Sequence, residues 1–112
     1  MRSVRQLAAM VQAPSQQEWH VDIESHGRAG VLTYVEGGGA IPFEWEFCTG
    51  PLIAEVWSDS WSVWDSRYPW AAGRRVIVLE RVAMEVVRQK ASHCRAAIDA
   101  SAGRVSIVAP AV

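Results

Sequence analysis

Histidine and carboxylate side chains recur at every second position in one short segment. They are His20, Asp22, Glu24 and His26. On a β-strand, residues two apart point to the same face at a spacing of about 7 Å. Imidazole and carboxylate groups are the ligands of Zn²⁺, Mn²⁺ and Fe²⁺ sites. A row does not converge on one ion, however. We therefore interpret this segment as a solvated strand face and regard His20, Asp22 and His26 as weak metal candidates.

A second group of carboxylates, Glu44, Glu46 and Glu55, suits acid–base chemistry or cation binding. Two carboxyl groups held close together separate their pKa values, as acid–base catalysis requires. A general acid also needs a cleft that excludes water. An open sheet face has such a cleft only if residues 58–70 fold over it. We therefore favour binding over catalysis and expect no cofactor.

Tryptophan is unusually frequent, with six in 112 residues. Trp19 and Trp45 fall on inward-facing strand positions and are expected in the core. The other four lie on an open-face position or in a segment without periodicity: Trp57, Trp61, Trp64 and Trp70. Such residues either anchor a loop across the sheet edge or form a recognition surface, where tryptophan is enriched. Tryptophan beside carboxylates also suits cation binding. The candidate binding residues are Glu44, Glu46, Glu55, Trp57, Trp61 and Trp64.

Other motifs argue against nucleophilic catalysis and against phosphate or nucleic-acid binding. Cys94 follows His93, but neighbours on a strand point to opposite faces. The glycines at 37–39 lack the Lys-Ser/Thr of a phosphate-binding loop. A pI of about 6.3, with glutamates interleaved among the arginines, argues against nucleic-acid binding.

Strict apolar–polar alternation predicts strands at 19–24 and 41–47, and residues 31–36 and 52–57 read as two further strands. Short glycine-rich turns connect them, which indicates an antiparallel meander with one wet face. By their phase, Glu24, Glu44, Glu46, Glu55 and Trp57 share that face.

Helical periodicity appears in the sequence before and after the meander. Residues 2–12, within an N-terminal segment 1–14, predict a short helix, and residues 71–91 predict a long one. On the long helix, one stripe is apolar and the opposite stripe contains Arg74, Arg81, Glu85 and Arg88. Residues 58–70 read as a Trp-rich loop, and strands at 94–99 and 105–108 form a C-terminal hairpin. We predict an α+β fold in one domain, 1–112: an antiparallel sheet of a four-stranded meander plus this hairpin, with the long helix packed on one face.

Charge is sorted along the chain. Residues 13–66 contain nine acidic side chains and one basic side chain, whereas residues 67–112 contain eight basic and three acidic ones. A field of one sign attracts partners of the other sign. The meander therefore carries the acidic surface, and most arginines of residues 67–112 lie on the helix behind it.

The layout of residues 38–99 resembles that of small bacterial immunity proteins encoded beside polymorphic or contact-dependent toxins. The residues that carry this resemblance are Gly50-Pro51, Ser60, Trp64, Tyr68-Pro69, Arg75 and Leu79. The resemblance implies a non-catalytic protein that binds a toxin and blocks it.

Three functions fit these observations. The first is a binding protein whose acidic, Trp-bearing sheet face holds a basic protein partner, as an immunity protein or inhibitor does. The second is a module or small enzyme with a carboxylate-lined pocket for a cationic small molecule. The third is a homo-oligomer such as a homodimer, in which the acidic sheet of one copy meets the basic helix of another. We expect a cytoplasmic protein without membrane or nucleic-acid binding, because Cys48 and Cys94 are isolated thiols and no apolar run is long enough to span a bilayer.

Overall fold

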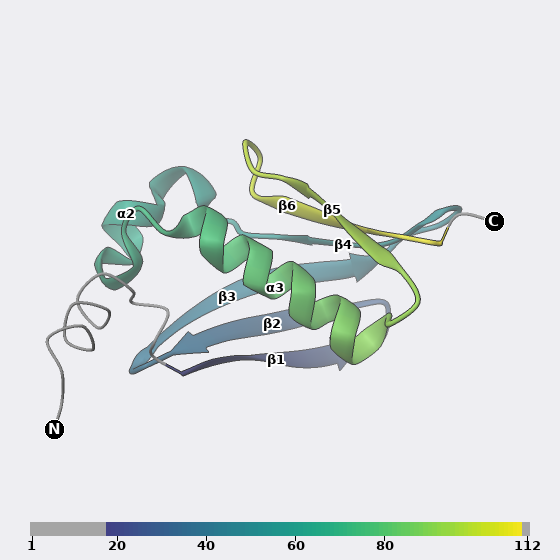
Figure 1. Ribbon diagram of the computed structural model, residues 1–112, viewed down its shortest axis with the longest axis horizontal. Helices are drawn as coiled ribbons and strands as arrows, with labels where there is room; N and C mark the ends of the chain where they lie inside the picture. The colour runs from purple at the N-terminus through teal and green to yellow at the C-terminus, as the bar shows by residue number, and fades with distance from the viewer. Residues whose placement is uncertain (1–17, 111–112) are drawn as a thin grey trace, which may run out of the picture.

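The computed structural model describes residues 18–110, which form a six-stranded antiparallel sheet with helices on one face (Figure 1). The strands are β1 (Trp19–His26), β2 (Ala29–Glu36), β3 (Gly39–Phe47), β4 (Leu52–Trp57), β5 (Arg95–Asp99) and β6 (Arg104–Val108). Their order in the sheet is β1-β2-β3-β4-β6-β5. The predicted α+β fold, with a meander followed by a hairpin, is confirmed. The helix predicted at 2–12 lies outside the described residues.

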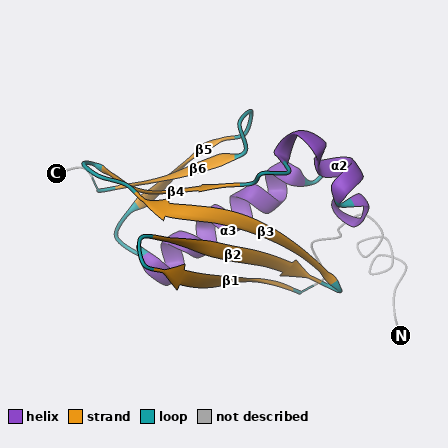
Figure 2. Cartoon of the chain, turned by 180° about the vertical axis from the view of Figure 1, so that it is seen from behind, coloured by secondary structure: helices purple, strands orange, loops and turns teal. Residues whose placement is uncertain are grey.

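The helical elements are concentrated between β4 and β5. They are η2 (Trp61–Val63), α2 (Trp64–Arg67), η3 (Pro69–Ala71) and α3 (Arg75–Lys90). Helix α3 crosses one face of the sheet, and the view from behind shows the opposite face without a covering layer (Figure 2). We call this uncovered side the open face. Within residues 18–110, no helix has both the length and the apolar character needed to cross a bilayer.

The main differences from the predicted boundaries arise at glycines. Strand β1 continues to His26 and β2 starts at Ala29, because Gly27 takes a positive φ of 74° and completes the turn in two residues. Helix α3 starts at Arg75 rather than at 71, since η3 and Gly73, with a φ of 76°, come first.

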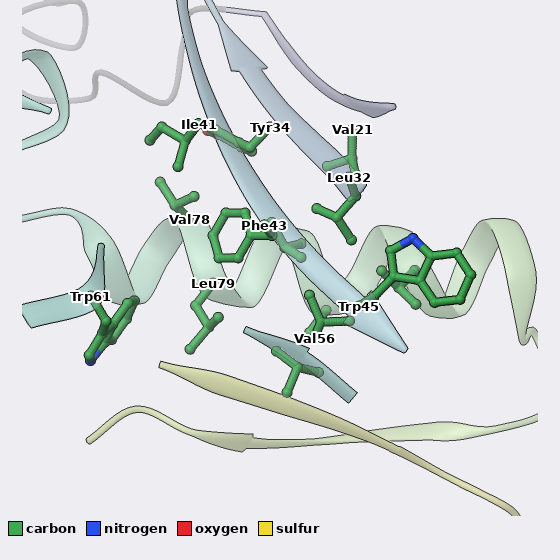
Figure 3. Packing of buried hydrophobic residues seen from close by; sticks show 14 of the residues in the cluster. Val21, Leu32, Tyr34, Ile41, Phe43, Trp45, Val56, Trp61, Val78 and Leu79 are labelled. Atoms are coloured by element: carbon green, nitrogen blue, oxygen red, sulfur yellow. The ribbon is translucent and has the colours of Figure 1, made fainter. Parts of the chain in front are cut away.

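Buried side chains from the helix-facing side of every central strand form one core (Figure 3). The predicted inward phases of β3 and β4 are confirmed, because Phe43, Trp45 and Val56 are buried there. Helix α3 closes the core with its apolar stripe: Val78, Leu79, Val82, Ala83 and Val86. Packing of this stripe overrides the strand propensity of the valine- and isoleucine-rich start of the helix.

The segment 58–70, predicted as a loop, is folded around two buried tryptophans. Trp64 is 1% exposed, and its Nε1 donates a hydrogen bond to the carbonyl oxygen of Ala71 at 3.0 Å. Trp61 packs against Trp64, with ring centroids 5.7 Å apart, and covers Gly103 at the end of the C-terminal hairpin. The tryptophans thus anchor this segment to the sheet, as one of the two interpretations proposed.

Gly30 allows close packing at the helix-facing side of β2. A Cβ atom there would overlap the carbonyl oxygen of Glu24 and the indole ring of Trp45. The ring lies across this glycine, and its Nε1 donates a hydrogen bond to the Glu24 carbonyl at 3.0 Å. The position of Trp45 therefore depends on the missing side chain at residue 30.

Gly30→Ala should lower the free energy of unfolding by about 1–3 kcal/mol, because the backbone at Glu24 and the indole of Trp45 must both shift. The matched control is Gly38→Ala, where a Cβ meets nothing within 4 Å and φ is not positive. Urea denaturation of both variants measures the difference. Equal stability of the two variants would contradict the packing described for Trp45.

Candidate functional site

Four predicted binding residues occupy adjacent positions of β3 and β4 on the open face. Glu44 pairs with Trp57 and Glu46 pairs with Glu55 across the two strands. We call Glu44, Glu46, Glu55 and Trp57 the acidic block. The glutamates of β3 are exposed, whereas Glu55 and Trp57 are half-buried. Alternation within the two strands thus places all four side chains on one face, as predicted.

Charge within and around the acidic block is only partly balanced. Glu46 and Glu55 are like charges directly opposite each other, an arrangement that costs free energy. Arg104 of β6 donates to Glu55 Oε1 at 2.8 Å, and its guanidinium carbon lies 5.8 Å from the centroid of the Trp57 ring. Arg104 therefore neutralises one carboxylate of the block and supports its tryptophan, while Glu44 and Glu46 form no ion pair with a basic side chain of residues 18–110.

Asp59 extends the negative charge beyond the end of β4. Its carboxyl group lies beside Glu44, and hydrogen bonding and repulsion between the two groups raise the pKa of Glu44. The negative charge of the acidic block therefore begins to fall at a higher pH than it would without Asp59. A cation placed between these two carboxylates would relieve the repulsion.

The row of histidines and carboxylates on β1 forms two separate pairs. His20 Nε2 lies 3.2 Å from Asp22 Oδ2, and His26 Nε2 lies 3.6 Å from Glu24 Oε1. All four side chains are exposed. No three His, Cys, Asp or Glu side chains of residues 18–110 are grouped to hold one metal ion.

Two of the predicted binding residues do not belong to this surface. Trp61 and Trp64 are 6% and 1% exposed and lie in the core on the helix side of the sheet. The prediction that both tryptophans belong to the binding surface is therefore wrong. The reason is that the short helical turns of this segment direct both rings inward, toward buried neighbours that include Tyr68 and Ala71.

A cluster of charged side chains is buried around Glu36, and the sequence patterns did not predict it. The side chain of Glu36 is fully buried. Arg74 Nη2 donates to its two oxygens at 2.9 and 3.0 Å, and Arg81 Nη1 lies 3.4 Å from Oε1. Tyr34 completes the cluster: its hydroxyl donates to Glu36 at 2.5 Å and accepts from Arg81 at 2.7 Å. Burial and the neighbouring carboxylate raise the pKa of Tyr34 to about 12.

This cluster corrects the prediction that Arg74 and Arg81 belong to the solvent-facing stripe of the helix. Their side chains are only 15% and 11% exposed. Glu36 has the same strand phase as Leu32 and Tyr34, so alternation alone already indicates that it faces the helix. What alternation does not indicate is which basic residues, some forty positions away, meet it there.

Most of the other basic side chains of α3 also have partners within the chain. Arg75 Nη1 donates to the carbonyl oxygen of Trp61 at 2.8 Å, and its guanidinium lies over the Trp61 ring. Arg88 pairs with Glu85 at 2.8 Å on the helix surface. The positive charge of the helix is therefore largely satisfied internally.

An apolar cavity of about 150 Å³ lies on the helix side of the sheet. Its walls include Trp45, Phe47 and Val86, and the one charged residue among them is Lys90. The glutamates of the acidic block do not line it. This cavity therefore differs from the carboxylate-lined pocket expected for a cationic small molecule.

Comparison with known proteins adds no family assignment, because no protein-family model, curated protein or solved structure matches the chain. The function is therefore argued from the residues and their geometry.

Glu36→Gln should lower the free energy of unfolding by about 3–5 kcal/mol, because it leaves two buried guanidinium groups without a negative partner. Glu80→Gln, an exposed residue of α3, should change it by no more than about 0.5 kcal/mol. Chemical denaturation followed by tryptophan fluorescence measures both. If Glu36→Gln is as stable as Glu80→Gln, the ion cluster does not hold β2 to α3.

Asp59→Asn should lower the pKa of Glu44, because it removes the neighbouring negative charge. A raised pKa means that the folded state binds the proton more readily than the unfolded chain. In the wild type, the contribution of Glu44 to stability therefore falls as the pH rises through that pKa. NMR titration of the side-chain carboxyl carbons measures the shift. An unchanged pKa in the variant would show that the two carboxyl groups do not interact.

Proposed function

We propose that the open face binds a basic protein partner and that the protein acts without catalysis. The observation that carries this proposal is the acidic block, which is displayed on a sheet face that no other described element covers. A basic partner supplies the positive charges that Glu44, Glu46 and Asp59 lack among residues 18–110. Complementary charge accelerates the encounter of two proteins and selects against wrong partners.

Exposure of the carboxylates supports binding over acid–base catalysis. Glu44 and Glu46 face solvent, so no cleft excludes water from them. The segment 58–70, which would have to close over the face to form such a cleft, instead directs Trp61, Trp64 and Tyr68 into the core on the helix side. An exposed, charged surface with one half-buried tryptophan resembles a protein-binding face more than an active site.

The internal pairing of the helix arginines supports a foreign partner over a second copy of this chain. A homo-oligomer that joins the acidic sheet to the basic helix needs free guanidinium groups on α3. Arg74 and Arg81 instead meet Glu36, and Arg75 meets the Trp61 carbonyl. Freeing either of the first two would leave Glu36 buried with an incomplete set of partners, at a cost of several kcal/mol.

An inhibitor of a toxin that acts on nucleic acid is the specific role that fits this chemistry best. A protein that holds phosphates presents lysine and arginine side chains, and surface carboxylates can occupy the same positions. The resemblance to small immunity proteins points in the same direction. The acidic block is then the part of the inhibitor that replaces the phosphates.

The double reversal Glu44→Lys/Glu46→Lys should weaken binding of a lysine- and arginine-rich peptide by about tenfold or more at low salt, because like charges across an interface cost several kcal/mol. Isothermal titration calorimetry measures the affinity. The fold should survive, since a lysine at position 46 faces Glu55 and replaces a repulsive pair by an attractive one.

Two single variants, Glu46→Lys and Glu80→Lys, test whether net charge alone explains the weaker binding. Both change the net charge equally, but Glu46 lies in the sheet and Glu80 lies in the helix layer. Only the first should weaken binding substantially. Equal weakening by both would mean that overall charge, and not the open face, attracts the peptide. For the inhibitor role, the product of an adjacent toxin gene replaces the peptide, and loss of protection by the double variant is expected.

A further inference from the structure

The apolar cavity on the helix side lies where the C-terminal half of α3 meets the first strands of the sheet. Its lining comes from β1, β2, β3, β4 and α3: Ile23, Ser25, Leu32, Trp45, Phe47, Val56, Val86 and Lys90. In Figure 3, Trp45 lies toward one end of the core, apart from the cluster around Phe43. The cavity is separated from the acidic block by the thickness of the sheet.

Packing of Trp45 explains why space remains at this point. Its indole lies across Gly30 and donates to the carbonyl oxygen of Glu24 on the neighbouring strand. The ring is thus held against the sheet and does not fill the gap below the helix. On the helix, the apolar residue that lines the gap is a small valine, Val86.

The walls and size of the cavity suit a small apolar group. Six of its eight lining side chains are apolar. An apolar cavity of roughly this volume in a folded protein accepts a molecule the size of benzene. A ring or a short branched chain would therefore fill the space of about 150 Å³ and remove it from water.

Polar groups are confined to the exposed part of the lining. Ser25 and Lys90 are exposed, and both are hydrogen-bond donors. Among residues 18–110, no carboxylate forms an ion pair with Lys90, in contrast to Arg74, Arg81, Arg88 and Arg104. The cavity thus combines an apolar interior with a cation at its mouth.

The exposed side chain of Phe47 points to the same conclusion. It is 47% exposed although it shares the inward phase of Phe43 and Trp45. Its ring meets that of Trp45 edge-on, at 5.1 Å between centroids. A ligand in the cavity would cover this apolar surface, which the chain itself leaves in contact with water.

We infer that this cavity binds a small apolar carboxylate, with its ring or branched chain between Trp45 and Val86 and its carboxylate at Lys90 and Ser25. The site is independent of the acidic block, because it lies on the other face and has the opposite charge. A carboxylate fits better than an amine, since Lys90 repels a cation and attracts an anion. Binding is reversible and involves no covalent step.

Phenylpropionate and its neutral analogue phenylpropanol are suitable probes, because they share the ring and the chain but differ in charge. In NMR titrations of the protein, phenylpropionate should bind saturably with a Kd of about 1 mM or lower. The Trp45 indole signal should shift. Phenylpropanol should bind about two- to fivefold more weakly, the difference expected for one exposed ion pair.

Two variants separate the charge from the space. Lys90→Gln should weaken phenylpropionate about two- to fivefold and leave phenylpropanol unchanged. The control Arg67→Gln removes the same charge from α2 and should affect neither probe. Val86→Leu should weaken both probes about fivefold or more, because the added methylene fills part of the cavity. Its control is Val87→Leu, since Val87 packs against the core without lining the cavity.

The proposal is overturned if neither probe binds saturably to the wild type. It is also overturned if Val86→Leu binds each probe with the same affinity as its control Val87→Leu. It is also overturned if Lys90→Gln weakens the acid and the alcohol to the same extent, because the ammonium group then plays no part in recognition. None of these outcomes depends on the partner proposed for the open face.

Discussion

Within residues 18–110, helices cover only one face of the sheet, and this divides the strand residues between two environments. The buried apolar groups of the strands point toward α3, because this is the side on which burial removes them from water. The opposite positions stay in solvent and are free to carry charge. The alternation of residue types along β1, β3 and β4 expresses this constraint. It places the core and the acidic block on the two sides of the same strands.

The ion cluster is an exception to this division of apolar and charged positions, and it links the sheet to the helix layer. Glu36 lies on the apolar side of β2, and its burial is tolerated because Arg74, Arg81 and Tyr34 surround it. A buried charge with all its partners adds little net stability, but removing one of the partners is strongly destabilising. The same contacts remove two cations from the helix surface. The chain thus combines a strongly acidic face with a helix whose arginines are engaged.

Local patterns explain how much of this structure could be predicted. Period-two alternation identified the strands and assigned Glu44, Glu46, Glu55 and Trp57 to one face, because the side-chain direction in a strand follows from sequence parity. The segment 58–70 has no period, so the inward direction of Trp61 and Trp64 follows only from their packing against Gly103 and Ala71. Pairing of Glu36 with Arg74, and the cavity beside Trp45, depend on contacts between distant residues, which no local pattern encodes.

The central claim is that the open face, and not the helix side, meets a basic partner. Mapping of backbone amide shifts in the two-dimensional NMR spectrum, on addition of a lysine- and arginine-rich peptide at low salt, tests it most directly. The account predicts shifts in β3 and β4 around Glu44, Glu46 and the indole of Trp57, with little change along α3. Shifts concentrated on α3, with the open face unaffected, would contradict it.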